Sequence, residues 1–144
     1  MILATRLVHD LTREAALQMA SLAHAAATRE GIAIAVAIVD RGGHIILVDR
    51  MDGAAACAVP LAVSKAETAV MTLAPTQAWF DSTQPGRADW GMNLALAGRF
   101  NAMPGGAPIS IAGDIIGGLG VSGGEASQDV VCASAALEGF EDCA

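Results

Sequence analysis

A few polar side chains lie where predicted strands end or where predicted helices begin, and these are the residues that could do chemistry. Arg50 and Asp52 flank Met51 at the end of a predicted strand. Lys65 lies among apolar positions of a predicted helix, and Asp129 lies at the start of the last one. An arginine can clamp a carboxylate, and a desolvated lysine can anchor one or move a proton. Two plainer interpretations stay open: a surface lysine, and an aspartate that serves the helix dipole.

The histidines form no metal-binding pair. His9, His24 and His44 are far apart, and no H-x-x-x-H or H-E-x-x-H spacing occurs. His24 lies mid-helix among alanines, where small neighbours would let a flat macrocycle reach its imidazole as an axial haem ligand. His44 lies at a predicted hairpin turn. Both histidines have an ordinary alternative, a satisfied or surface side chain.

The sequence contains two known functional motifs, but neither lies in the structural context that its function requires. Gly118 to Gly123 reads G-x-G-x-x-G, yet it falls within a predicted strand and too near the end of the sequence for a dinucleotide-binding unit. Ser122 falls in a G-x-S-x-G pattern, but no histidine follows it to complete a triad. Glycines inside a strand instead indicate the close approach of another backbone or of a flat ligand.

Composition narrows the classes of function. The 144 residues fit one domain, residues 1–144, of which 53% are apolar and only 16% charged, with a net charge of −7. Such an apolar chain leaves surface for a ligand or a second subunit to cover. The acidic balance and the absence of basic runs argue against nucleic-acid and membrane partners. Three widely spaced cysteines without C-x-x-C, and no signal peptide or membrane span, predict free thiols in the cytoplasm.

The hydrophobic pattern predicts helices packed on a mostly antiparallel sheet, an α+β arrangement built from two hairpins. In the strand that begins at Ile32, alternate residues point to opposite faces, and both faces should be buried. The predicted elements are a helix from Thr12 to Gly31, a hairpin from Ile32 to Arg50 that turns at Asp40–Gly43, a helix from Leu61 to Leu73, two short helices between Thr76 and Gly98, a hairpin from Ala107 to Ser122, and a last helix capped by Ser127.

Several short stretches, in order along nearly the whole chain, resemble the GlcG/HbpS family, which includes the C-terminal domain of PduO-type proteins. They are Val39-Asp40-Arg41-Gly42-Gly43-His44, Arg50-Met51-Asp52-Gly53-Ala54, Ser64-Lys65-Ala66, Pro104-Gly105-Gly106-Ala107-Pro108-Ile109, and Gly120-Val121-Ser122-Gly123 with Gln128-Asp129. The resemblance implies an α/β-type sandwich with a five-stranded antiparallel sheet. It also implies self-association, from tetramer to octamer, and haem binding in several members.

The resemblance also implies a pocket shared between subunits. By position its candidates are Arg50, Asp52, Lys65, Gly105, Gly106 and Asp129. In this interpretation Arg50 and Lys65 pair with haem propionates or another carboxylate, Met51 and Met103 hold the flat body, and His24 is the axial ligand.

Two functions follow as hypotheses. The first is a protein that binds haem or another small ligand. The alternative is a cofactor-independent enzyme, an isomerase, tautomerase or hydrolase, that acts on a small carboxylated catabolite. There Lys65 or His44 would move the proton, Asp52 or Asp129 would orient it, and Arg50 would clamp the carboxylate.

Overall fold

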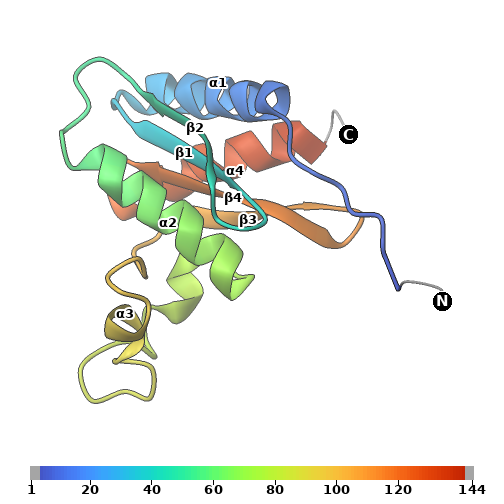
Figure 1. The fold of residues 1–144 in the computed structure, drawn as a ribbon. Helices are drawn as coiled ribbons and strands as arrows, with labels where there is room; N and C mark the ends of the chain where they lie inside the picture. The colour runs from blue at the N-terminus through green and yellow to red at the C-terminus, as the bar shows by residue number, and fades with distance from the viewer. Residues whose placement is uncertain (1–3, 142–144) are drawn as a thin grey trace.

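The computed structural model describes residues 4–141 and confirms an α+β fold in which helices cover both faces of an antiparallel sheet (Figure 1). The sheet contains β1 (Ala35–Asp40), β2 (Ile45–Arg50), β3 (Gly106–Ile111) and β4 (Asp114–Ser122) in the order β2-β1-β4-β3. All neighbouring strands are antiparallel. The expectation of five strands is wrong, because the two hairpins supply four strands. The residues before β3 are tied by side-chain hydrogen bonds rather than by a ladder.

The first helix forms as predicted. α1 (Arg13–Glu30) begins after Thr12, whose hydroxyl accepts a hydrogen bond from the Ala15 amide at 3.1 Å. Gly31 ends it with a positive φ of 70°. The chain then enters β1 at Ala35, later than the predicted Ile32, because the Ile32 amide still bonds to the carbonyl of Ala27 at the helix end.

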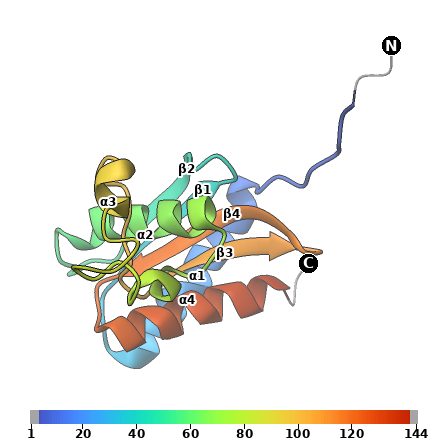
Figure 2. The ribbon, with the colours of Figure 1, turned by 90° about the horizontal axis from the view of Figure 1, so that it is seen from below.

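The two faces of the sheet pack against different helices (Figure 2). Ile34, Val36 and Ile38 join the core beneath α1 and α4 (Ala126–Glu141). Their alternate neighbours in β1 join a smaller core with α2 (Ala58–Thr72). Both faces of β1 are therefore buried, as its apolar alternation predicts.

Glycines let α2 lie directly on the sheet. A Cβ atom on Gly118 would collide with the carbonyl oxygen of Ala66, and one on Gly120 with that of Ala62. The pattern that resembles a dinucleotide motif is thus a contact between a strand and a helix backbone.

The segment between α2 and β3 extends away from the sheet (Figure 1). It contains two short helices, η1 (Thr76–Trp79) and α3 (Met92–Ala95), near where the sequence predicts them. The last helix begins at Ala126, so Ser127 is inside it and is not its cap. The Gln128 side chain instead accepts a hydrogen bond from the Glu125 amide at 3.0 Å. Within residues 4–141, no helix is both long and apolar enough to cross a membrane.

Candidate functional site

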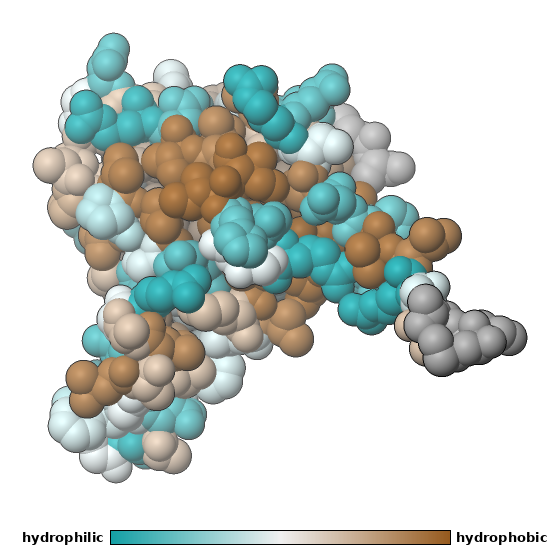
Figure 3. All heavy atoms as spheres, viewed as in Figure 1, coloured by the Kyte–Doolittle hydropathy of each residue, from teal (hydrophilic) through white to brown (hydrophobic). Residues whose placement is uncertain are grey.

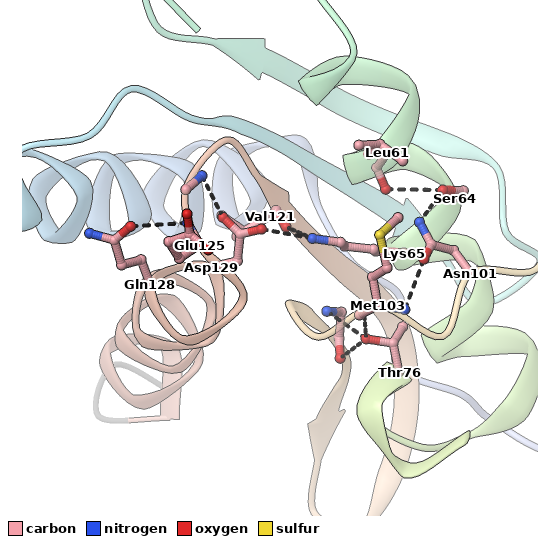
Figure 4. A network of polar contacts seen from close by, with 12 residues as sticks. Leu61, Ser64, Lys65, Thr76, Asn101, Met103, Val121, Glu125, Gln128 and Asp129 are labelled. Atoms are coloured by element: carbon pink, nitrogen blue, oxygen red, sulfur yellow. Dashed lines mark hydrogen bonds and ion pairs between the residues drawn. The ribbon is translucent and has the colours of Figure 1, made fainter. Parts of the chain in front are cut away.

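A buried ion pair joins three elements at one end of the sheet (Figure 4). The Lys65 ammonium, from the middle of α2, donates to the Asp129 carboxylate and to the Val121 carbonyl, both at 2.8 Å. Lys65 is only 2% exposed and Asp129 only 3%. The second carboxylate oxygen of Asp129 accepts from the Gly124 amide at 3.0 Å. The pair therefore ties α2 and the end of β4 to the first turn of α4.

Two glycines close over this pair. Gly105 has a φ of 116°, and a Cβ atom there would lie 2.9 Å from the Asp129 Cβ and 3.1 Å from the Lys65 Nζ. A Cβ atom on Gly106 would lie 2.6 Å from the Lys65 carbonyl oxygen. The structure thus brings together four predicted site residues, Lys65, Gly105, Gly106 and Asp129. The charges of Lys65 and Asp129, however, are paired with each other. Losing either partner would leave an unpaired buried charge.

The carboxylate of Asp129 also affects its own helix. Cys132, almost one turn further along α4, is fully buried. Burial raises the pKa of its thiol, and the negative charge of Asp129 raises it further. Burial and the raised pKa both favour the unreactive thiol form of Cys132.

Beside the ion pair lies a polar network that the sequence did not reveal (Figure 4). The Asn101 side chain donates to the Ser64 hydroxyl and accepts from the Met103 amide, both at 2.9 Å. Its backbone amide donates to Thr68 at 2.8 Å. The Thr76 hydroxyl donates to the Met103 carbonyl at 2.7 Å and accepts from the Gly106 amide at 3.0 Å. Only the spacing of Ser64 and Thr68, one helical turn apart and flanking Lys65, was a usable signal.

An open pocket of about 680 Å³ adjoins this network. Ser64, Asn101 and Met103 line it from the network side, and Trp90 and Leu94 line it from the projecting segment. Met103 is the one predicted ligand-binding residue in its lining. Arg50 and Lys65 are not in that lining.

His24 lies on the other face of the sheet, between α1 and β2. Its Nδ1 is 3.8 Å from an Asp49 carboxylate oxygen, and its side chain is 23% exposed. Its Nε2 is buried and has no hydrogen-bond partner among residues 4–141. The surrounding helix positions are small, with Ser21, Ala25 and Thr28 exposed beside it.

The remaining candidates divide between the two ends of the sheet. Arg50 and Asp52 are exposed at the end of β2, and Met51 packs against the core beneath α1. Arg50 on β2 and Ser122 at the end of β4 both pair with Ala35 of β1. Strand β1 therefore lies between Arg50 and the end of β4.

His44 lies at the opposite end of the sheet, in the β1–β2 turn, and is 82% exposed there. Its Nδ1 is 3.1 Å from Asp40. Burial opposes ionisation of Asp40, but hydrogen bonds from the His44 and Gly42 amides prevail and hold the pKa of that carboxyl below its usual range. His44 therefore belongs to a turn and does not meet Lys65 or Asp129.

The sequence and the fold are similar to those of known proteins. Residues 11–138 match the family described as haem degrading protein HbpS-like, and this chain belongs to that family.

The chain is 34% identical to an uncharacterized 15.0 kDa protein of Citrobacter freundii, over 94% of this chain and 95% of that protein. It is 35% identical to the corrinoid adenosyltransferase PduO of Salmonella typhimurium over 90% of this chain, but it spans only 36% of that protein.

Solved structures show the same fold. The chain superimposes on the Klebsiella pneumoniae protein ORFY with a TM-score of 0.93 and 33% identity, over 98% of this chain and 97% of that one. It superimposes on PduOC in a haem complex with a TM-score of 0.86 and 33% identity, over 90% of this chain and 94% of that one.

Proposed function

We propose that this chain binds haem over the outer strand β2, with His24 as the axial ligand. The observation that carries this proposal is the set of contacts made by the two ring nitrogens of His24. One ring nitrogen faces the Asp49 carboxylate, and the other has no partner among residues 4–141. Histidines that bind metals commonly direct their second nitrogen at a carboxylate, which fixes the ring and raises its basicity.

An apolar surface lies beside this imidazole. We call Ile45, Ile46, Leu47 and Val48 the β2 patch; these residues of the edge strand are exposed or half-buried, and Leu47 packs toward α1 whereas Val48 packs toward α2. Figure 3 shows apolar side chains gathered over β2, between α1 and α2. An apolar area on a sheet edge needs a covering partner. A flat macrocycle that approaches past the small residues of α1 would supply one.

Arg50 is a cation at the end of β2, on the α2 face of the strand, whereas Asp49 and His24 lie on the α1 face. Arg50 is exposed at the last position of β2, and the described part of the chain contains no ion pair to it. A guanidinium pairs well with a carboxylate such as a haem propionate. Lys65 has no such role in this proposal, because Asp129 already holds it.

Coordination requires a local movement. The Nε2 atom is covered, whereas part of the imidazole is exposed. The proposal therefore requires the side chains that cover Nε2 to move while Nδ1 stays at the Asp49 carboxylate.

The relatives support the ligand. The family description names haem degradation, and a similar solved structure is a haem complex. The enzyme alternative has less support from the geometry, because His44 lies far from Lys65 and Asp129, and Asp129 neutralises the lysine that would act as base.

The test is a titration of the purified protein with haemin, followed by absorbance. The wild type should give a saturable complex with a sharp Soret band. His24→Ala should weaken binding by at least about tenfold, whereas His44→Ala should not change it. Equal binding by His24→Ala would contradict the assignment of the ligand, and a featureless wild-type titration would contradict haem binding.

We also propose that the chain self-associates, between tetramer and octamer, and acts in the cytoplasm. Support for association comes from large apolar side chains left exposed, among them Ile45 at 57% and Leu94 at 86%. The acidic composition, with a net charge of −7, suits a partner other than nucleic acid or an anionic membrane.

A further inference from the structure

The 680 Å³ pocket has a chemical character different from that of the proposed haem surface. Its walls come from α2, from the segment around α3 and from residues 100–103, on the opposite side of the sheet from His24. Its size lies within the range of small-molecule sites. No residue in its lining carries a charge.

Its walls are apolar and partly aromatic. Leu61, Leu94 and Met103 give aliphatic and thioether surface, and Trp90 and Phe100 give rings. Phe100 is 8% exposed and is fixed by an edge-to-face contact with Trp79, at a centroid distance of 6.5 Å. One wall is therefore rigid, while Trp90, which is 61% exposed, offers a ring face to a ligand.

The Asn101 side chain is a polar group of the pocket that is fixed and incompletely used. Asn101 is 8% exposed, and its orientation is determined because the Met103 amide can only donate to the side-chain oxygen. Its NH₂ group therefore faces Ser64 and donates one hydrogen to that hydroxyl. Among residues 4–141, no acceptor is found for the second hydrogen, and the oxygen keeps an unused lone pair.

We propose that this pocket binds an uncharged molecule with a flat apolar body and a carboxamide or lactam group. An amide satisfies both the spare hydrogen and the spare lone pair of Asn101, and the flat body lies against Trp90. A carboxylate placed against the buried Asn101 side chain would be desolvated without a cation to pair with it, which is costly. The lining offers no cation to the two propionates of haem, and the pocket lies on the opposite side of the sheet from the site proposed over β2.

The experiment compares naphthamide with naphthoate, which share a ring system and differ in charge. Binding to the full chain is measured by calorimetry and by the shifts of the two tryptophan indole N–H signals. Naphthamide should bind at least about tenfold more tightly than naphthoate and should shift the Trp90 signal. Equal or tighter binding of naphthoate, or no binding of naphthamide at millimolar concentration, would overturn the proposal.

Two variants with exposed side chains locate the site without endangering the fold. Trp90→Ala should weaken naphthamide binding by roughly tenfold, because it removes the ring face. Phe80→Ala is the matched control, since Phe80 is 48% exposed on the same segment but does not line the pocket. Equal effects of the two variants would contradict the assignment.

His24→Ala separates this proposal from the one for haem. Naphthamide binding should be unchanged in that variant, and haemin binding should be unchanged in Trp90→Ala. Displacement of naphthamide by one equivalent of haemin would show a single shared site and would overturn the inference.

Discussion

Lys65 and Asp129 show how a charged pair can serve the fold rather than a ligand. Both side chains are almost fully buried, and they contact each other and backbone groups of β4 and of the turn before α4. We therefore expect Lys65→Met to lower the free energy of unfolding by about 3–5 kcal/mol, because it leaves an unpaired buried carboxylate. Urea denaturation measures this change.

The double variant Lys65→Met with Asp129→Leu is the control. It removes both charges, so its loss of stability should be well below the sum of the two single losses. Additive losses would mean that the two groups do not interact, contrary to the structure.

The sequence singles out residues that the fold brings together at this position, but it does not predict their contacts with one another. Lys65, Gly105 and Asp129 were all selected as candidates, and the fold brings them together. The ion pair between Lys65 and Asp129 joins positions 64 residues apart in the chain, and no local sequence pattern predicts a contact over such a separation. Asn101 was missed for the same reason, because its partners lie on α2, more than 30 residues earlier.

At the scale of elements, the contact between α2 and β4 depends on the absence of side chains. A Cβ atom on Gly120 would collide with the Ala62 carbonyl and lie 2.6 Å from the Ala66 nitrogen, both of them backbone atoms that cannot rotate away. We expect Gly120→Ala to destabilise the protein by about 3 kcal/mol. Thermal and urea unfolding would measure the loss.

Gly91→Ala is the matched control, because nothing lies within 4 Å of a Cβ atom there and its φ of −77° suits any residue. Its stability should remain within about 0.5 kcal/mol of the wild type. If both variants were equally stable, α2 would not lie as close to the sheet as described.

The elements themselves were largely predictable, because periodicity and turn residues act locally. The caps Thr12 and Gly31 predict the two ends of the first helix. The apolar alternation in Ile34–Val39 predicts that both faces of β1 are buried. The family resemblance added a fifth strand that the two hairpins do not supply. The start of α4 was misplaced because Gln128, rather than Ser127, satisfies the backbone before the helix.

At the scale of the whole molecule, the sheet has an exposed apolar edge. Ile45 is 57% exposed on β2, which has a hydrogen-bonded neighbour on one side. A lysine on an edge strand blocks edge-to-edge pairing. Ile45→Lys should therefore lower the molar mass of the haem-free assembly measured by light scattering.

Val131→Lys is the comparison for that experiment, since Val131 is 46% exposed on α4. Its mass should match that of the wild type. Dissociation by Val131→Lys but not by Ile45→Lys would place the contact between copies on α4 and contradict the role of the β2 edge.

Haem bound over β2 can be detected directly by nuclear magnetic resonance. In protein with isotope-labelled Ile, Leu and Val methyl groups, ferric haemin should broaden the signals of Ile45–Val48 through its unpaired electrons, and a gallium porphyrin should not. Signals of Leu61 and Leu94, in the pocket on the other side of the sheet, should stay sharp. Broadening of Leu61 and Leu94 with sharp signals from β2 would contradict the account.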